Sequence, residues 1–96
     1  MPKAYWVATY RSVSKPENLT AYSKLAAQAI EAAGGKFIAR GTAAKAYEHG
    51  TLSRTVVIEF PSVAAAIAAH DSPGYAAALK ALGDGADREI RIVEGI

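Results

Sequence analysis

The feature that most constrains the fold of this chain is the order in which strand-like and helix-like patterns of apolar residues follow one another. Four short stretches have strand-like sequences, rich in β-branched and aromatic residues with a period of two. Two longer stretches carry apolar residues at three- and four-residue spacing, as amphipathic helices do. The strand-like stretches cover residues 3–13, 36–47, 54–60 and 88–94, and the helical stretches cover 16–33 and 63–82. This β-α-β-β-α-β order is the signature of the ferredoxin-like layout.

The same order predicts how the sheet is arranged. Because crossover connections are right-handed, the first and third strands should lie at its centre, with both helices on one face. We therefore expect an α+β fold with a four-stranded antiparallel sheet whose other face is uncovered. With 96 residues the chain is long enough for one domain and too short for two, so we expect a single domain over residues 1–96.

Residues with known capping and breaking tendencies mark where the elements end. Ser14 and Glu17 have the spacing of a capping box at the start of the first helix, and Gly34 suits a left-handed position after its end. Ser72, followed by a proline, is expected to divide the second helical stretch and to cap the helix after the break. In the second strand, Gly41 predicts a bend or a bulge.

Composition excludes several classes of function. The 11 basic and 9 acidic residues form no basic run, so nucleic acid is not an expected partner. The absence of cysteine excludes disulfides, thiolate catalysis and Cys-ligated metals. No apolar run approaches the roughly 20 residues that cross a bilayer, and the N-terminal segment lacks a signal-peptide pattern. We expect a soluble, cytoplasmic protein without a membrane partner.

The uncovered sheet face is expected to carry charges among apolar side chains. Alternation along the third strand places Glu59 on this face, and alternation along two other strands places Arg40 and Arg91 beside it. Two interpretations stay open: a structural ion pair inside a homodimer contact, and a site that faces a ligand. Two neighbouring guanidinium groups would favour the ionised carboxylate, which argues against Glu59 as a general acid.

Other polar and aromatic side chains are candidates for chemistry. His70 and Tyr75, on either side of the helix break, are the candidate catalytic residues, and Arg40, Glu59 and Tyr22 are the candidate ligand-binding residues. His70 lies on the apolar stripe of its helix, where a histidine is commonly packed and hydrogen-bonded, but a histidine also suits a general base. The two histidines lack the spacing of a metal-ligand set, so we expect no metal and no cofactor.

Four aromatic residues leave two interpretations open. Trp6, Tyr10, Tyr22 and Tyr75 form either part of the core or the lining of an apolar pocket between helices and sheet. The many alanines of both helical stretches do not decide the matter, because small side chains either bring a helix close to the sheet or leave room for a ligand.

At residues 54–62, which read Arg-Thr-Val-Val-Ile-Glu-Phe-Pro-Ser, the chain resembles the domain-of-unknown-function family 1330, within the dimeric α/β-barrel superfamily. The resemblance covers essentially the whole chain. Its other motifs are Pro16-Glu17, Tyr22, Gly34-Gly35, Arg40-Gly41, Glu48, Ser72-Pro73-Gly74-Tyr75 and Val93-Glu94-Gly95. The resemblance implies a ferredoxin-like fold and a homodimer. It implies no activity, because the family has no established one and fold does not determine function.

Three positions depart from the pattern of that family. Lys15 stands where the family commonly has Asp, and His49 stands where a Gly usually follows the loop Glu. Leu82 aligns with a position that is commonly Arg. If that Arg touches a ligand in relatives, this chain lacks the contact.

Three hypotheses for function follow. The first is a dimer that binds or transforms a small molecule in a pocket between helices and sheet. The second, by analogy with the superfamily, is a cofactor-free oxygenase or isomerase of small aromatic or enolisable compounds. The third is a non-catalytic dimerisation module. A pocket with converging polar groups would favour the first two over the third.

Overall fold

The computed structural model describes residues 2–96. Its elements are β1 (Ala4–Val13), α1 (Pro16–Ala32), β2 (Lys36–Thr42), β3 (Arg54–Phe60), α2 (Val63–His70), α3 (Pro73–Leu82) and β4 (Ala86–Glu94). The sheet is antiparallel throughout and has the order β2-β3-β1-β4. The expected ferredoxin-like arrangement, with the first and third strands at the centre, is confirmed.

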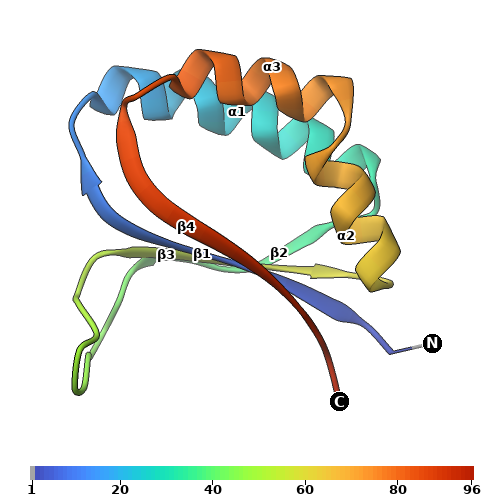
Figure 1. Ribbon diagram of the computed structural model, residues 1–96, viewed down its shortest axis with the longest axis horizontal. Coiled ribbons are helices and arrows are strands. Elements are labelled where there is room, and N and C mark those ends of the chain that lie inside the picture. Colours follow the sequence, from blue (N-terminus) through green and yellow to red (C-terminus); the bar gives the residue numbers. More distant parts are fainter. Residues whose placement is uncertain (1) are drawn as a thin grey trace.

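The molecule has two layers. All three helices lie over one face of the sheet, with α1 and α3 side by side, while the β2–β3 loop and the C-terminus reach past the sheet on its other side (Figure 1). The alternate residues of β1 and β3 that point toward the helices are buried, as their period of two requires. The largest fully buried side chains are Trp6, Ile30, Ile58, Phe60 and Tyr75.

The helix boundaries depend on local capping. Ser62 caps α2 by accepting from the amide of Ala65, and Ser72 caps α3 by accepting from the amide of Tyr75. The division of the second helical stretch at Ser72 is therefore confirmed.

The expected capping box at the first helix is wrong. Lys15 is the N-cap of α1 and makes no side-chain cap. The Ser14 hydroxyl instead donates to the carbonyl of Asp84, and the amides of Ser14 and Lys15 donate to the carbonyl of Gly85. The start of α1 is thus held by the turn before β4. Gly34 does adopt a left-handed φ of 92° after α1, as expected.

The second strand differs most from the sequence prediction. It ends at Thr42 rather than near residue 47, because Thr42 pairs with Arg54, the first residue of β3, where the pairing of the two strands ends. The register shifts between Phe37 and Ala39, so the bulge lies at Ile38; Gly41 has a positive φ of 155° but keeps the register. One extra residue at Ile38 reverses the alternation of the strand after it.

Helix α2 turns a different face inward than its apolar pattern suggests. Ala66 and Ala69 are its buried residues, whereas Ile67 is 47% exposed. Small side chains let the helix lie close to the sheet, since Ala66 and Ala69 belong to the same core cluster as Trp6. Within residues 2–96, no helix has both the length and the apolar character needed to cross a membrane.

Candidate functional site

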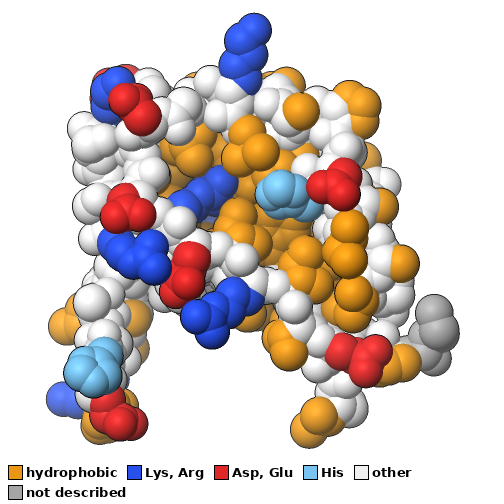
Figure 2. Space-filling model, in the orientation of Figure 1, with side chains coloured by type: hydrophobic (Ala, Val, Ile, Leu, Met, Phe, Trp, Pro, Cys, Tyr) orange, Lys and Arg blue, Asp and Glu red, His pale blue; other side chains and the backbone are white. Residues whose placement is uncertain are grey.

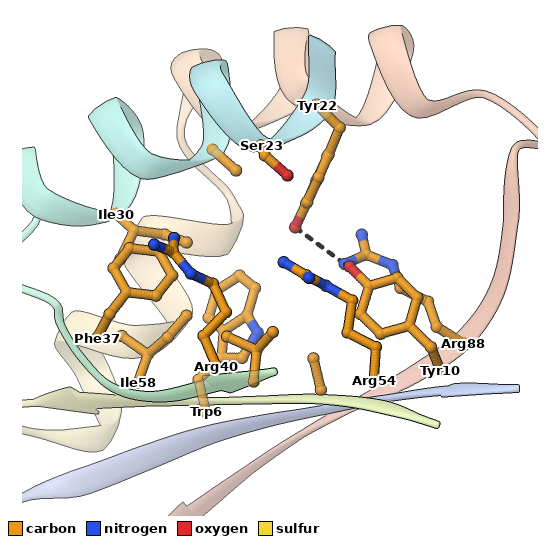
Figure 3. Close-up of a pocket in the computed structure, with 13 residues that line it drawn as sticks. Trp6, Tyr10, Tyr22, Ser23, Ile30, Phe37, Arg40, Arg54, Ile58 and Arg88 are labelled. Atoms are coloured by element: carbon orange, nitrogen blue, oxygen red, sulfur yellow. Dashed lines mark hydrogen bonds between the residues drawn. The ribbon is translucent and has the colours of Figure 1, made fainter. Parts of the chain in front are cut away.

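A cleft separates α1 from the sheet. The space between its side chains is about 370 Å³ when the solvent at its open mouth is counted, and the centre of a water-sized sphere fits into only about 30 Å³ of it. Thirteen side chains line it, from α1 and from all four strands (Figure 3). They are Trp6, Ala8, Tyr10, Tyr22, Ser23, Ala26, Ile30, Phe37, Arg40, Arg54, Val56, Ile58 and Arg88. The cleft is therefore mostly apolar and aromatic, with three arginines as its charged groups.

The three arginines come from three different strands, and strand periodicity explains why they point inward. Arg54 precedes the inward-facing Val56 by two positions, and Arg88 likewise precedes Ile90. Arg40 pairs with Val56 across β2 and β3 because the bulge at Ile38 shifts the register. In Figure 3 the side chains of Arg40 and Arg54 rise from the sheet toward α1.

The placement of Arg40 corrects the sequence prediction. Simple alternation puts Arg40 on the open face beside Glu59, but the bulge turns it to the helix-covered face, where it lines the cleft with Tyr22. Glu59 lies on the opposite face and forms an ion pair with Lys3, with 3.0 Å between Nζ and Oε1. Arg91 has Glu89 as its ionic partner, at 3.5 Å. The expected cluster of Glu59 with two arginines therefore does not form.

Arg88 is surrounded by tyrosine hydroxyls. Its Nη1 donates to the hydroxyls of Tyr10 at 3.2 Å and Tyr22 at 2.9 Å, and its Nη2 donates to that of Tyr75 at 3.2 Å. Its guanidinium carbon also lies 4.5 Å from the centre of the Tyr22 ring. Burial opposes the charge, but the contacts with Tyr22, Tyr75 and Tyr10 outweigh it and raise the pKa of Arg88 above its usual value. Arg88 is therefore a fixed positive charge.

Tyr22 joins the cleft to the core. Its hydroxyl lies 2.6 Å from that of Tyr75, which is fully buried, while its ring lines the cleft. Burial, followed by the neighbouring Tyr75, raises the pKa of Tyr22 well above its usual range, although Arg88 acts in the opposite direction. At neutral pH Tyr22 is thus a neutral hydrogen-bonding group and cannot serve as a base.

Arg54 and Arg40 have few partners. The guanidinium of Arg54 lies 5.8 Å from the centre of the Tyr10 ring, and its Nε is buried without a hydrogen-bond partner. The guanidinium of Arg40 lies 5.1 Å from the centre of the Phe37 ring, and Arg40 is exposed at the mouth of the cleft. Within residues 2–96, no carboxylate lies within 4 Å of the guanidinium nitrogens of Arg40, Arg54 or Arg88.

His70 lies outside this cleft. It lines a second hollow between α2 and β4, wider and more open than the cleft, together with Asp71, whose Oδ1 is 3.3 Å from the His70 Nδ1. The other side chains of this hollow are apolar: Ile67, Ile90 and Ile92. Figure 2 shows hydrophobic side chains gathered between the helices and the sheet, with one of the histidines among them. The ring of His70 is 5.1 Å from that of Tyr75, but the Tyr75 hydroxyl points instead to Tyr22 and Arg88.

The candidate residues predicted from the sequence therefore lie in several separate parts of the structure. Tyr22 and Arg40 line one cleft, Tyr75 supports it from the core, His70 lies in the second hollow and Glu59 lies on the other face of the sheet. Sequence reasoning did not place Arg54 and Arg88 in the site. A signal was present, because each arginine lies two positions before an inward-facing apolar residue of its strand.

The comparisons with known proteins agree with this architecture. The model of the family described as "Domain of unknown function (DUF1330)" matches residues 3–96. The chain belongs to the DUF1330 family. The resemblance in the sequence motifs is therefore confirmed, and DUF1330 membership assigns no activity. No curated protein matches this DUF1330 chain.

Solved structures match the DUF1330 chain over nearly its whole length. A protein of unknown function from Rhodopseudomonas palustris is 18% identical with a TM-score of 0.78, covering 99% of this chain and 83% of its own. A dimeric ferredoxin-like protein of unknown function from Thermobifida fusca is 21% identical with a TM-score of 0.65, covering 98% and 92%. SnoaB, a cofactor-independent oxygenase from Streptomyces nogalater, is 16% identical with a TM-score of 0.63, covering 100% and 95%. At these identities the likeness shows the ferredoxin-like fold.

Proposed function

We propose that this DUF1330 protein binds a small organic anion in the cleft between α1 and the sheet. One observation carries the proposal: Arg40, Arg54 and Arg88 converge on the cleft, and no carboxylate of residues 2–96 lies within 4 Å of their guanidinium nitrogens. Arg54 and Arg88 are half-buried and Arg40 is exposed, and a charge that is partly removed from water is normally paired, because an unpaired charge in an apolar environment is costly. An anionic ligand would supply the missing negative charge.

The rest of the lining limits the kind of ligand. Apart from the arginines, the cleft offers aromatic and aliphatic side chains and the hydroxyls of Ser23, Tyr10 and Tyr22. An apolar pocket with a few convergent polar groups is the usual form of a small-molecule site. Attraction between the arginines and an anion is also stronger there than in water, because the surroundings have a lower dielectric constant.

The proposal is tested by isothermal titration calorimetry of the full chain with a panel of one-ring organic acids. We expect binding that weakens as salt is added, because charge pairing supplies much of the affinity. Arg91→Met removes an arginine of the open face and serves as the control that should bind as the wild type does. If no acid of the panel binds, the proposal is wrong.

His70→Phe separates this site from the second hollow. The substitution keeps the bulk of the ring and lies outside the α1 cleft, so the affinity for the acids should not change. Loss of binding in His70→Phe, with an unchanged melting temperature, would place the site at His70 and return it to the role of candidate catalytic residue.

A second candidate is a cofactor-free oxygenase or isomerase. Fixed cations in an apolar cleft stabilise negative charge that develops on an enolate or phenolate, which would activate an enolisable substrate. The structural likeness to SnoaB, described as a cofactor-independent oxygenase, is the analogy that supports it. Among residues 2–96, neither a carboxylate nor a histidine lines the cleft to act as a base, so binding alone is the first choice. Oxygen uptake that depends on an added enolisable acid would establish the second candidate.

We also propose that the protein is a homodimer joined through the open sheet face. Ile38 and Val93 are about half exposed on strands whose opposite face carries the core, and Val57 occupies a central strand of the same face. Apolar surface of this kind is usually covered by a partner. The similar Thermobifida fusca protein is described as dimeric. A dimer that binds no ligand would leave the dimerisation module as the remaining hypothesis.

A further inference from the structure

We infer that Arg54 is the anchor of the bound anion, and that this anion is the carboxylate of a small acid with an apolar body. The inference rests on the proposed function and assigns different roles to the three arginines. Arg54 and Arg40 bind the ligand, whereas Arg88 stabilises the arrangement of the residues that line the cleft.

Arg88 already has its hydrogen bonds. Three tyrosine hydroxyls accept from its two terminal nitrogens at 2.9–3.2 Å. A ligand that took over these donors would leave the hydroxyls of Tyr22 and Tyr75, both buried, with fewer partners. Arg88 therefore has a structural role and adds positive charge near the cleft, but it is not the residue that contacts the ligand directly.

Arg54 is in the opposite situation. Its Nε is buried without an acceptor, which is a costly state for a charged donor. Protein atoms cover this Nε, so a ligand in the cleft meets the terminal N–H groups of Arg54, which are not buried in this way. The terminal N–H groups of a guanidinium include parallel donors, and a planar carboxylate accepts from two of them at once. We therefore place the carboxylate at the terminal nitrogens of Arg54.

Arg40 supplies a second cation from the neighbouring strand. Arg40 and Arg54 both line the cleft, and their side chains rise from the sheet in the same direction (Figure 3). Because Arg40 is exposed at the mouth, it can meet an incoming acid before the acid reaches Arg54.

The rest of the cleft selects against strongly polar ligands. Trp6, Ile30, Phe37, Val56 and Ile58 form most of the remaining surface, and among these five only the indole N–H of Trp6 can pair with a sugar hydroxyl. The residues of α1 that line the cleft lie between Tyr22 and Ile30, in the later part of the helix. The free amides of a helix N-terminus, which commonly bind phosphate, are therefore not directed into the cleft. These features favour a one-ring carboxylic acid over a phosphate ester.

The experiment is calorimetry on the full chain with three matched probes: benzoate, benzamide, which has the same shape without the charge, and phenyl phosphate. Benzoate should bind and benzamide should not. In Arg54→Met the affinity for benzoate should fall by roughly tenfold or more, since a charge-assisted bidentate contact is lost. Arg54→Lys keeps the charge without the parallel donors and should also bind benzoate more weakly than the wild type.

Melting temperatures of the unliganded variants give an independent readout. Arg54→Met should melt no lower than the wild type, because it removes a buried donor that nothing satisfies, whereas Arg88→Met should melt lower because three tyrosine hydroxyls lose a donor.

The outcomes separate the inference from the proposed function. Wild-type affinity for benzoate in Arg54→Met would overturn the assignment of the anchor and leave the anion site standing. Tighter binding of phenyl phosphate than of benzoate would overturn the assignment of the carboxylate. Failure of the wild type to bind any organic anion would overturn both the inference and the proposed function.

Discussion

The hydroxyl oxygens of Tyr22 and Tyr75 lie 2.6 Å apart, although the two residues are separated by 53 positions in the chain and belong to different helices. Arg88 on β4 donates to both of them. One guanidinium therefore connects α1, α3 and the sheet at the inner end of the cleft. The group that presents positive charge to the cleft is also one that holds the two layers together.

Tyr75→Phe tests this connection. The change removes a fully buried hydroxyl that bonds to Tyr22 and Arg88, and should lower the free energy of unfolding by about 1–3 kcal/mol. Urea unfolding followed by circular dichroism measures the effect. Tyr47→Phe, at an exposed tyrosine, is the matched control and should change little. An equal effect in both variants would show that the hydroxyl cluster contributes nothing to stability.

The raised pKa of Tyr22 predicts a pH dependence of stability. The ordinary tyrosine pKa is 10.0, and burial raises that of Tyr22 in the folded state. The folded state then holds a proton that the unfolded chain loses, so the contribution of Tyr22 is fully present below about pH 10 and declines as the pH rises above it. Urea unfolding between pH 8 and 11 should show this decline in the wild type and a smaller one in Tyr22→Phe. Identical slopes would contradict it.

The order of the elements and the bounds of β3 could be predicted because they depend on local pattern. Residues 54–60 form a strand in which Val56, Ile58 and Phe60 are buried, as their period of two requires. The break at Ser72 likewise follows from the capping preference of serine before a proline. No knowledge of distant contacts is needed for either.

The charged part of the site could not be predicted, because it depends on register and on contacts far apart in sequence. A bulge at Ile38 leaves no clear mark in the sequence, yet it decides which face receives Arg40. The charge on Arg88 is acceptable in the interior because tyrosines from β1, α1 and α3 surround it. An arginine at an inward strand position is the signal to look for in such sequences.

Ser72 should matter more than the proline that follows it. Its hydroxyl accepts from the amide of Tyr75 at 3.2 Å and donates to the carbonyl of Ala69 at 2.8 Å, joining the end of α2 to the start of α3. Ser72→Ala should lower the free energy of unfolding by about 0.5–2 kcal/mol. Pro73→Ala should be tolerated, because the first helical turn needs no amide donor at this position. Thermal unfolding compares the two, and a larger loss in the proline variant would contradict this account of the helix break.

If the protein is a dimer joined through the open sheet face, a charge introduced on that face should convert it into a monomer. Val57→Lys places a charge at the centre of the open face, opposite Val7 in the register of β1 and β3, and should prevent association without unfolding the chain. Ala32→Lys, at an exposed position near the end of α1, is the control and should leave the dimer intact. Light scattering at micromolar concentration measures both. A wild-type monomer would rule out the dimer, and a Val57→Lys dimer would place the contact elsewhere.

The central claim is that an organic anion binds between α1 and the sheet, and a crystal structure of the protein grown with benzoate tests it most directly. We expect density for the benzoate ring beside Trp6 and Phe37, with a carboxylate oxygen within hydrogen-bonding distance of a terminal nitrogen of Arg54. Benzoate bound in the hollow at His70 or on the open sheet face, with only water in the α1 cleft, would contradict the account.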